Sequence, residues 1–398
     1  MKISIPLILL IALGSIQLSA QDNAQRFEAK GEYYQIHSYI SQEHAESMAV
    51  QLDVLFDFFN SYFHFDPHRL PAPLQVRIYG SQQEYAEYTG RYVGDPQEDY
   101  VYLHYSDPQR SELIGYQQDS PANRQALSHQ GFIQFLRGFI PNPPLWIREG
   151  FAVYFEHSHY DHELNTVAYR ENLSWLETLK SDLEPGLFQE FSVQELLTMT
   201  TAEAQEYLEE FYPRSWGLVS FLLHSPAREY NRALWDSISA LNPNYSLNDN
   251  SQAVVQNAFQ WLDAETLTED FHFYIDTRQS FRSLVQQGIQ LYSQDSHDRA
   301  EQQFIQALNL QDSNYIPYYY LGLINYARGN YTLADSYYST ALELGADEPV
   351  TLYAMGVNAY ADQRPEDAVE LLENAVTLDP EGYRERVEQL IERIREEA

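Results

Sequence analysis

Hydrophobic and polar residues follow two different periods in the first part of the chain. Large and polar side chains alternate from Tyr33 to Tyr39, from Leu74 to Tyr79 and from Tyr100 to Tyr105, and this two-residue period predicts three β-strands. After the first of them, Ser41 precedes a pattern with a helical period. Its apolar face carries Met48, Leu52, Leu55, Phe59 and Phe63. A capping-box sequence from Ser81 to Glu84 starts a second helix. Residues 24–115 are therefore predicted to form a small α+β layer.

The pattern becomes almost entirely helical after Ser120. Pro121 stands in a first helical turn, where proline is well tolerated. The sequence from Ser192 to Glu195 is another capping box, and the apolar run from Arg214 to Leu223 predicts a further helix. We expect residues 116–280 to form the helical partner of the α+β layer.

The last third of the chain repeats itself with a period of 34 residues. Three units follow one another without gaps, over Phe281–Asn314, Tyr315–Glu348 and Pro349–Gly382. Small residues recur at three positions of the unit: glycine at the eighth (Gly288, Gly322 and Gly356), and alanine at the twentieth (Ala300, Ala334 and Ala368) and the twenty-seventh (Ala307, Ala341 and Ala375). A large residue recurs at the twenty-fourth position: Phe304, Tyr338 and Leu372. The spacing resembles that of tetratricopeptide (TPR) repeats, whose helix pairs stack into a solenoid. Residues 281–382 are thus predicted to form three TPR repeats, and the charged amphipathic residues 383–398 a helix that caps the stack.

Composition places the chain among globular proteins that do not bind nucleic acid. Its 398 residues are 44% hydrophobic and 14% aromatic, which is enough for two or three domains with real cores. Asp and Glu outnumber Lys and Arg by 58 to 24, and the net charge of −34 repels nucleic acid and anionic lipid. The sequence has no cysteine, which excludes disulfides, thiolate metal sites and a cysteine nucleophile.

Residues 1–20 have the pattern of a secretory signal. Lys2 precedes an apolar run from Ile3 to Ile16, and Ala20 is followed by polar residues. The run is short for a membrane span, and no second long apolar stretch follows it. We expect cleavage after Ala20, a mature chain without a transmembrane segment, and a periplasmic or secreted location.

Chemistry-bearing residues gather between Ser128 and Glu156. His129, Gln130 and Ile133 stand at the first, second and fifth positions of a window in which zinc peptidases carry histidine, glutamate and histidine on one helix. An amide cannot take a proton from a metal-bound water, and isoleucine has no lone pair to offer a metal. The window therefore predicts a helix without the second metal ligand and without the general base.

The same stretch resembles the peptidase MA-like gluzincin family, over roughly residues 30–230. The resemblance is strongest in the turn and helix after the histidine, at Pro141, Asn142, Pro144, Trp146, Glu149, Gly150, Ala152, Tyr154, Phe155 and Glu156. It implies that His129 matches the first zinc ligand and Glu149 the third. Gln130 then falls on the general base and Ile133 on the second histidine. What the resemblance implies is a peptidase fold without a catalytic residue, and no metal or other cofactor is expected.

Two interpretations of this site stay open. In the first, the module is a pseudopeptidase in which His129 is a hydrogen-bonded core residue and Glu149 pairs locally. In the second, it is a zinc metallopeptidase with unorthodox ligands, taken from these two residues and from His157, His159 and His162. The spacing of the three downstream histidines matches no established motif and is typical of a polar loop after a helix.

The repeats offer a second candidate site. In TPR solenoids the first helix of each pair lines the concave face. Tyr292, Tyr326 and Tyr360 occupy the twelfth position of the three units, and Tyr319 and Tyr353 the fifth position of the second and third. Such phenols can bind an extended protein segment by flat contact and hydrogen bonds, or they can pack between helices. Basic residues that would clamp a carboxylate-ended peptide are missing from these positions.

Taken together, the patterns predict a predominantly helical chain with an α+β layer, a helical gluzincin-like module and an all-α solenoid. The expected function is that of an exported, non-catalytic scaffold whose solenoid binds a protein partner, with the metallopeptidase as the alternative. A third hypothesis, a glycan or cell-wall binder, rests on the high aromatic content alone.

Overall fold

The computed structural model describes residues 25–93, 98–183 and 192–397. The chain divides between Arg278 and Gln279 into two compact units. The predicted signal at residues 1–20 lies outside the described residues. None of the helices in the described part is both long and apolar enough to cross a membrane.

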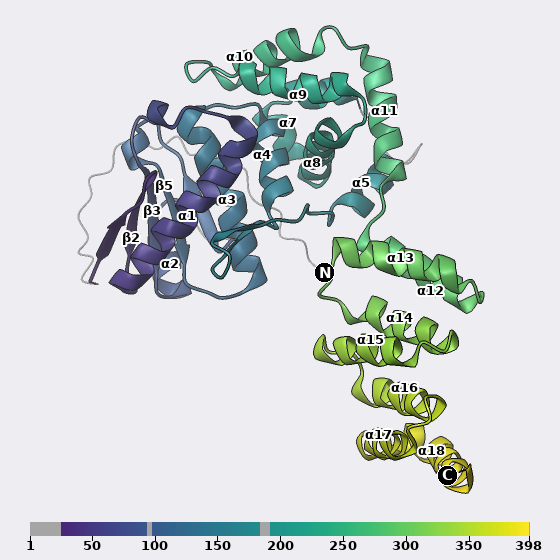
Figure 1. Cartoon of the computed structure of the whole chain (residues 1–398). Coiled ribbons are helices and arrows are strands. Elements are labelled where there is room, and N and C mark those ends of the chain that lie inside the picture. The colour runs from purple at the N-terminus through teal and green to yellow at the C-terminus, as the bar shows by residue number, and fades with distance from the viewer. Residues whose placement is uncertain (1–24, 94–97, 184–191, 398) are drawn as a thin grey trace. The chain divides into compact units, whose positions relative to one another are not determined.

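The first unit is built on a five-stranded sheet (Figure 1). In spatial order its strands are β1 (Phe27–Lys30), β2 (Tyr34–Ser38), β3 (Leu74–Tyr79), β5 (Glu112–Tyr116) and β4 (Tyr100–Leu103). The central β2, β3 and β5 are parallel, and β1 and β4 are antiparallel at the two edges. The predicted strands β2, β3 and β4 are confirmed. The two-residue period does not reveal β1 or β5, and β5 is a strand buried at four of its five residues, which leaves no alternation to detect.

Helices cover both faces of this sheet. On one face, α1 (Gln42–Phe63) and α3 (Pro121–Phe139) pack into the main core, and on the other α2 (Gln82–Thr89) covers a smaller tyrosine-rich cluster. Their N-terminal boundaries are confirmed, because Ser41, Ser81 and Ser120 each accept a hydrogen bond from the backbone N–H three residues on. Two 3₁₀ turns, η1 (Pro67–Arg69) and η2 (Pro108–Arg110), lie in the connections.

The rest of the first unit is mostly helical, as predicted. Its helices are α4 (Leu145–Phe155), α5 (Leu176–Asp182), α6 (Val193–Thr198), α7 (Thr201–Glu206), α8 (Leu208–His224), α9 (Arg228–Ala240), α10 (Leu247–Val254), the π-helical η3 (Val255–Phe259) and α11 (Ala264–Thr277). The prediction of a polar loop after α4 is partly wrong. Part of this segment forms a two-stranded hairpin of β6 (His159–Asp161) and β7 (Thr166–Ala168). Its strands are only three residues long and have no buried residue, so their sequence shows no apolar alternation.

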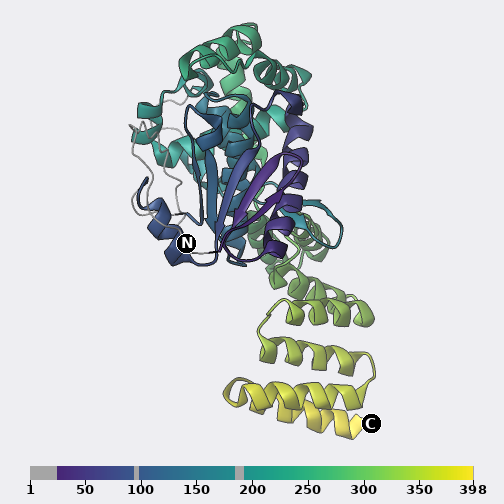
Figure 2. The ribbon, with the colours of Figure 1, turned by 90° about the vertical axis from the view of Figure 1, so that its left-hand side faces the viewer.

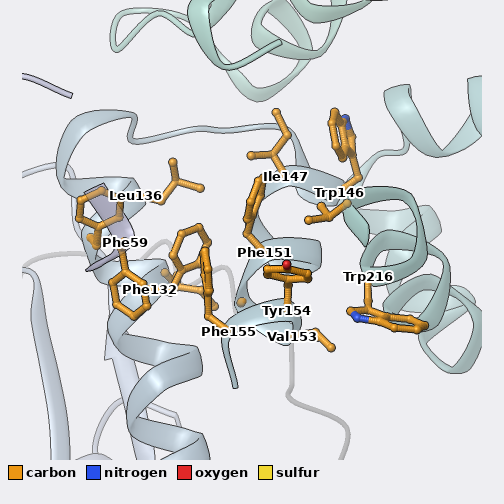
Figure 3. Close-up of a cluster of buried hydrophobic side chains, with 14 of the residues drawn as sticks. Phe59, Phe132, Leu136, Trp146, Ile147, Phe151, Val153, Tyr154, Phe155 and Trp216 are labelled. Atoms are coloured by element: carbon orange, nitrogen blue, oxygen red, sulfur yellow. The ribbon is translucent and has the colours of Figure 1, made fainter. Parts of the chain in front are cut away.

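Helix α4 is the centre of the core (Figure 3). All eleven of its residues are buried, and the labelled rings of Phe151, Tyr154 and Phe155 lie between α3 and the Trp216 side of α8. Gly150 is required by the close approach of α8, because a Cβ atom at this position would lie 2.4 Å from the backbone oxygen of Ser215. The glycine of the family-like pattern thus has a packing role in this chain.

The second unit is a TPR-like array of helix pairs (Figure 2). The pairs are α12 (Phe281–Ser293) with α13 (His297–Leu310), α14 (Tyr315–Ala327) with α15 (Tyr331–Glu343), and α16 (Glu348–Ala361) with α17 (Pro365–Leu378), followed by α18 (Pro380–Glu397). Each second helix packs on its partner and on the next helix along the chain, and the first helices of neighbouring pairs also contact each other. The predicted cap at 383–398 begins three residues earlier, because Asp379 accepts the backbone N–H of Gly382 and Pro380 fits the first turn.

The repeat positions pack as their sizes predict. In each pair the glycine at the eighth position lies under the large side chain at the twenty-fourth, so that a Cβ atom would come within 2.4 to 2.7 Å of that side chain: Gly288 under Phe304, Gly322 under Tyr338 and Gly356 under Leu372. Glycine allows the two helices of a pair to approach, and the large residue fills the space that remains.

Candidate functional site

The stretch from Ser128 to Glu156 contains the second half of α3 and the whole of α4, which pack against each other. His129 and Gln130 lie in the middle of α3, which packs against the edge strand β4 as well as against α4. Glu149 lies in α4 and Glu156 is its C-terminal cap residue. Seven residues are about two helical turns, so the two glutamates are on the same side of α4, where they face His129.

His129 is held between these two carboxylates. Its Nδ1 lies 2.8 Å from Oε1 of Glu156, and its Nε2 lies 3.6 Å from Oε2 of Glu149. The first contact is a hydrogen bond, whereas the second is an ion pair that is too long for one. The His129 side chain is only 4% exposed. Asn172 fixes Glu156 from the other side, because its Nδ2 donates to Oε2 at 2.5 Å.

Arg148 provides a second cation beside Glu149. Its Nε donates to Oε1 of Glu149 at 2.6 Å, and both side chains are almost completely buried. The two oxygens of Glu149 are therefore shared between a guanidinium and an imidazole. With His129 protonated, two cations and two carboxylates cancel in formal charge, which reduces the cost of burying them.

The electrostatics of the pair follow from these contacts. Burial alone lowers the pKa of His129, but Glu149 and Glu156 outweigh burial and raise this pKa to about 10. Burial alone raises the pKa of Glu149, but Arg148 and then His129 lower it to about 2. The arrangement therefore favours an imidazolium and a carboxylate over the neutral imidazole that binds a metal.

Gln130 and Ile133 have structural partners. The Gln130 side-chain oxygen accepts the backbone N–H of Tyr102 in the edge strand β4 at 3.3 Å. Ile133 is 8% exposed and belongs to the main hydrophobic core. One residue thus joins α3 to the sheet edge and the other fills the core, and neither offers a base or a metal ligand.

Two further groups lie near the carboxylates. Glu98, just before β4, has a pKa raised mainly by burial, and its Oε1 has no hydrogen-bond partner. The pKa of Tyr212 in α8 is raised well above its usual range by burial and then by Glu149. The carboxylates of α4 thus face groups from the sheet edge and from α8.

The donor set does not fit a hydrolytic zinc site. Three protein ligands hold zinc in such sites. Of the positions that the resemblance matches to ligands, His129 and Glu149 face each other but Ile133 has no donor atom, and Arg148 already binds the Glu149 carboxylate. Among the described residues, no group of three or more His, Asp or Glu side chains is placed to hold a metal ion. His159 and His162 are exposed on the hairpin, and His157 is half-buried just after α4.

The five tyrosines predicted for the solenoid all lie on its first helices and are half-buried. Tyr292 stacks on His297, with ring centroids 5.4 Å apart, and Tyr353 lies 5.2 Å from Tyr383 of α18. Tyr319 lies 5.9 Å from the buried Tyr338, and Tyr326 6.2 Å from Tyr331. Tyr360 packs against the last hydrophobic cluster. The rings therefore take part in packing and keep some exposed surface as well.

Sequence reasoning missed several residues of the two candidate sites, the charged cluster around His129 and the row of solenoid tyrosines. The seven-residue spacing from Glu149 to Glu156 is a signal that would place the second carboxylate beside His129. Arg148 has no comparable signal, because a neighbour in a helix points in another direction. Asn172 lies in a loop outside the two helices, and no spacing predicts its contact. Tyr383 follows the last repeat and is outside the 34-residue pattern.

No known family model matches this chain. The curated proteins contain no match to it either. A similar solved structure is the first TPR of Spaghetti (RPAP3) bound to the HSP90 peptide SRMEEVD, which is 17% identical, covers 30% of this chain and 92% of that chain, and has a TM-score of 0.28. The helix pairs and their glycine contacts in the chain itself carry the TPR-like assignment of residues 281–378.

Proposed function

We propose that this protein is an exported, non-catalytic scaffold that binds a protein partner through its TPR-like solenoid. In this proposal the first unit is a pseudopeptidase with a gluzincin-like fold. The observation that carries the partner-binding part is the row of half-buried tyrosines on α12, α14 and α16. Tyrosine, a rigid aromatic side chain with a hydroxyl group, is among the residues that most often anchor protein interfaces.

The loss of catalysis is supported by what each former chemical position contacts. Gln130 binds the edge strand, Ile133 fills the core, and Glu149 is paired with Arg148. Restoring a hydrolytic site would need a base, a ligand and the removal of a competing cation. Loss of a general base alone lowers rates by roughly 10²–10⁴.

Export is supported by the apolar run that precedes Ala20. Mass spectrometry of the protein purified from its native cells is the test, and the proposal expects an N-terminus at Gln21 and recovery outside the inner membrane. A full-length chain in the cytoplasm would contradict export.

Partner binding is tested with the full chain as bait in an envelope extract. The variant Tyr319→Ala/Tyr353→Ala removes two rings from the first helices, and Tyr207→Ala/Tyr245→Ala removes two exposed rings of the first unit, 45% and 42% exposed, as the matched control. We expect capture of a specific protein that is lost with the first variant and kept with the second. Equal capture by both variants would contradict a role for the solenoid tyrosines.

The alternative function is a zinc metallopeptidase with unorthodox ligands. One observation favours it: the buried Nε2 of His129 has no hydrogen-bond partner and faces Glu149. This alternative expects chelator-sensitive peptide cleavage that disappears in His129→Ala. Cleavage that persists in this variant, or no cleavage at all, would argue against it.

A further inference from the structure

The tyrosine-bearing side of α12, α14 and α16, which we call the first-helix face, carries almost no formal charge. Among the residues of these three helices Arg282, at the start of α12, is the one Lys or Arg, and Glu348, at the start of α16, is the one Asp or Glu. Half-buried Leu323 and Val357 lie between the tyrosines along their helices. The face is thus aromatic and aliphatic, with its charges at the helix ends.

The aromatic rings continue from one helix pair to the next. Tyr292 of α12 lies 5.4 Å from Tyr320 of α14, and Tyr353 of α16 lies 5.2 Å from Tyr383 of α18. Tyr319 lies between these two pairs of rings. Its ring centroid is 5.8 Å from that of Tyr320, and its pKa is raised to about 12 by burial first and then by Tyr383, Tyr320 and Tyr292. Phenols from α12, α14, α16 and α18 therefore lie near one another along the solenoid.

Two of the cations close to this face are already engaged in ion pairs. Arg328, just after α14, binds Asp298 and Glu301. Arg364, just before α17, binds Asp335, Asp362 and Asp367. Arg299 is exposed, but it lies on the second helix α13. On the first helices α12, α14 and α16 an acidic partner would find a single cation, the exposed Arg282 at the start of α12.

Two carboxylates border the end of the row near α18. Asp347 caps α16 by accepting the backbone N–H of Val350, and Asp379 accepts that of Gly382. Both help to raise the pKa of Tyr383, after burial, while Arg386 opposes them. The phenols at this end are therefore placed next to negative charge.

We propose that the first-helix face binds an extended protein segment that carries arginine or lysine side chains. This inference rests on the proposed partner-binding function and names the chemistry of the partner. The faces of tyrosine rings attract cations, with guanidinium preferred, and nearby carboxylates add to this attraction. The chain itself shows the contact, since Arg77 and Arg110 each lie 4.8 Å from the centre of a tyrosine ring, Tyr88 and Tyr105. A carboxylate-rich segment would instead meet aromatic faces and a net charge of −34.

The length of the segment follows from helix spacing. Neighbouring helices pack about 8–10 Å apart, so the row from α12 to α18 spans roughly 30 Å. An extended chain advances about 3.3 Å per residue, and about nine residues therefore cover the row.

The experiment measures binding of the full chain to fluorescent peptides of about nine residues by anisotropy. One peptide alternates arginine with serine, the second has glutamate in place of arginine, and the third has leucine. Two variants test the face: Tyr353→Ala, and Asp347→Asn/Asp379→Asn, in which asparagine keeps the capping hydrogen bonds. The matched control is Glu343→Gln/Glu370→Gln, which removes two exposed carboxylates from the second helices α15 and α17.

We expect the arginine peptide to bind and the glutamate peptide not to bind. Affinity for the arginine peptide should fall about tenfold in Tyr353→Ala, which is a typical loss for an interface tyrosine. It should fall several-fold in Asp347→Asn/Asp379→Asn and stay unchanged in the control. The asparagine pair keeps the test valid if Tyr353→Ala proves unstable.

Three results would overturn the inference. An equal loss in the control variant would show a general attraction between a polycation and an acidic protein. Tight binding of the glutamate or leucine peptide that Tyr353→Ala removes would disprove the proposed charge preference while leaving solenoid-mediated binding intact. No binding of the arginine peptide would also reject the inference, whereas the proposed function itself fails only if partner capture from the extract does not depend on Tyr319 and Tyr353.

Discussion

His129 is a buried histidine that lies between two carboxylates, those of Glu149 and Glu156. In a zinc site the Nε2 of such a histidine binds the metal as a neutral ring, and a carboxylate orients the other nitrogen. Here Glu156 orients Nδ1, while Nε2 faces the carboxylate of Glu149. The proton on Nε2 of His129 therefore lies between the imidazole and Glu149, where a zinc site would have the metal ion.

This arrangement predicts a specific pH dependence of stability. The folded pKa of His129, about 10, is above the value of about 6.5 in an unfolded chain. The contribution of the imidazolium to the free energy of unfolding is thus complete below about pH 6.5 and is lost as the pH rises through 10. Glu149, with its pKa lowered to about 2, contributes fully above its ordinary value near 4.5 and loses the contribution as the pH falls through 2.

Nuclear magnetic resonance of histidine-labelled protein measures this directly. We expect one ring signal that stays in its protonated position at pH 8 and is missing in His129→Gln. Other histidines, such as His104 with its pKa lowered to about 3 by burial and then by Arg137, should be neutral at that pH. A His129 signal that titrates near pH 6.5 would contradict the ion-pair account.

Removing Glu149 should be costly. In Glu149→Gln the buried cations His129 and Arg148 lose their shared carboxylate, and breaking a buried ion pair costs about 3–5 kcal/mol of unfolding free energy. All five tryptophans lie in the first unit, so urea unfolding followed by tryptophan fluorescence reports on that unit. The control Arg124→Gln removes an exposed pair with Asp119 and should cost about 0–1 kcal/mol. Equal effects of the two substitutions would show that the buried network contributes nothing special.

At the scale of elements, two glycines on neighbouring helices should respond in opposite ways to alanine. Gly131, inside α3, has no atom within 4 Å of an added Cβ, so Gly131→Ala should stabilise the first unit by about 1 kcal/mol through helix propensity. Gly150, inside α4, would place a Cβ against the α8 backbone, and Gly150→Ala should destabilise by roughly 1–3 kcal/mol. The same fluorescence-detected urea unfolding checks both, and a stabilising Gly150→Ala would refute the packing role of this glycine.

Elements were predictable from the sequence where a local rule fixes them. The repeated glycine and ring positions, such as Gly322 with Tyr338, locate every helix pair of the solenoid, and serine caps locate α1, α2 and α3. The strand β5 was not predictable because both its faces are buried, and the hairpin β6–β7 because it has no apolar face.

The candidate site was predictable only in part, for a similar reason. Helical spacing brings His129 close to Glu149 once α3 and α4 are known to pair. The contacts of Arg148 and Asn172 depend on side-chain directions and on a loop, and no sequence period encodes either. Tertiary packing therefore decides whether His129 and Glu149 bind a metal ion or pair with neighbouring side chains.

At the scale of the whole molecule, the two units carry different kinds of evidence about function. In the first unit the buried charged groups of α3 and α4 form ion pairs with one another. The second unit keeps a row of partly exposed aromatic rings. This division supports a protein whose binding surface lies in the repeats.

Substitutions at positions 130, 133 and 148 test the proposed gluzincin-like character of the first unit. Gln130→Glu/Ile133→His/Arg148→Gln places a carboxylate and a second histidine on α3 and removes the cation that competes for Glu149. We expect this variant to gain about one zinc per chain, because the first ligand is already oriented by Glu156. No gain of zinc would show that the pocket has been repacked beyond a metal site.

The most direct test of the central claim is the zinc content of the natural chain, purified from its native cells without added metal and measured by mass spectrometry. We expect far less than one zinc per chain, because His129 is protonated and Glu149 is bound by Arg148. The restored variant serves as the positive control for the measurement. About one zinc per natural chain, lost in His129→Ala, would show that His129 binds a metal and would support the metallopeptidase.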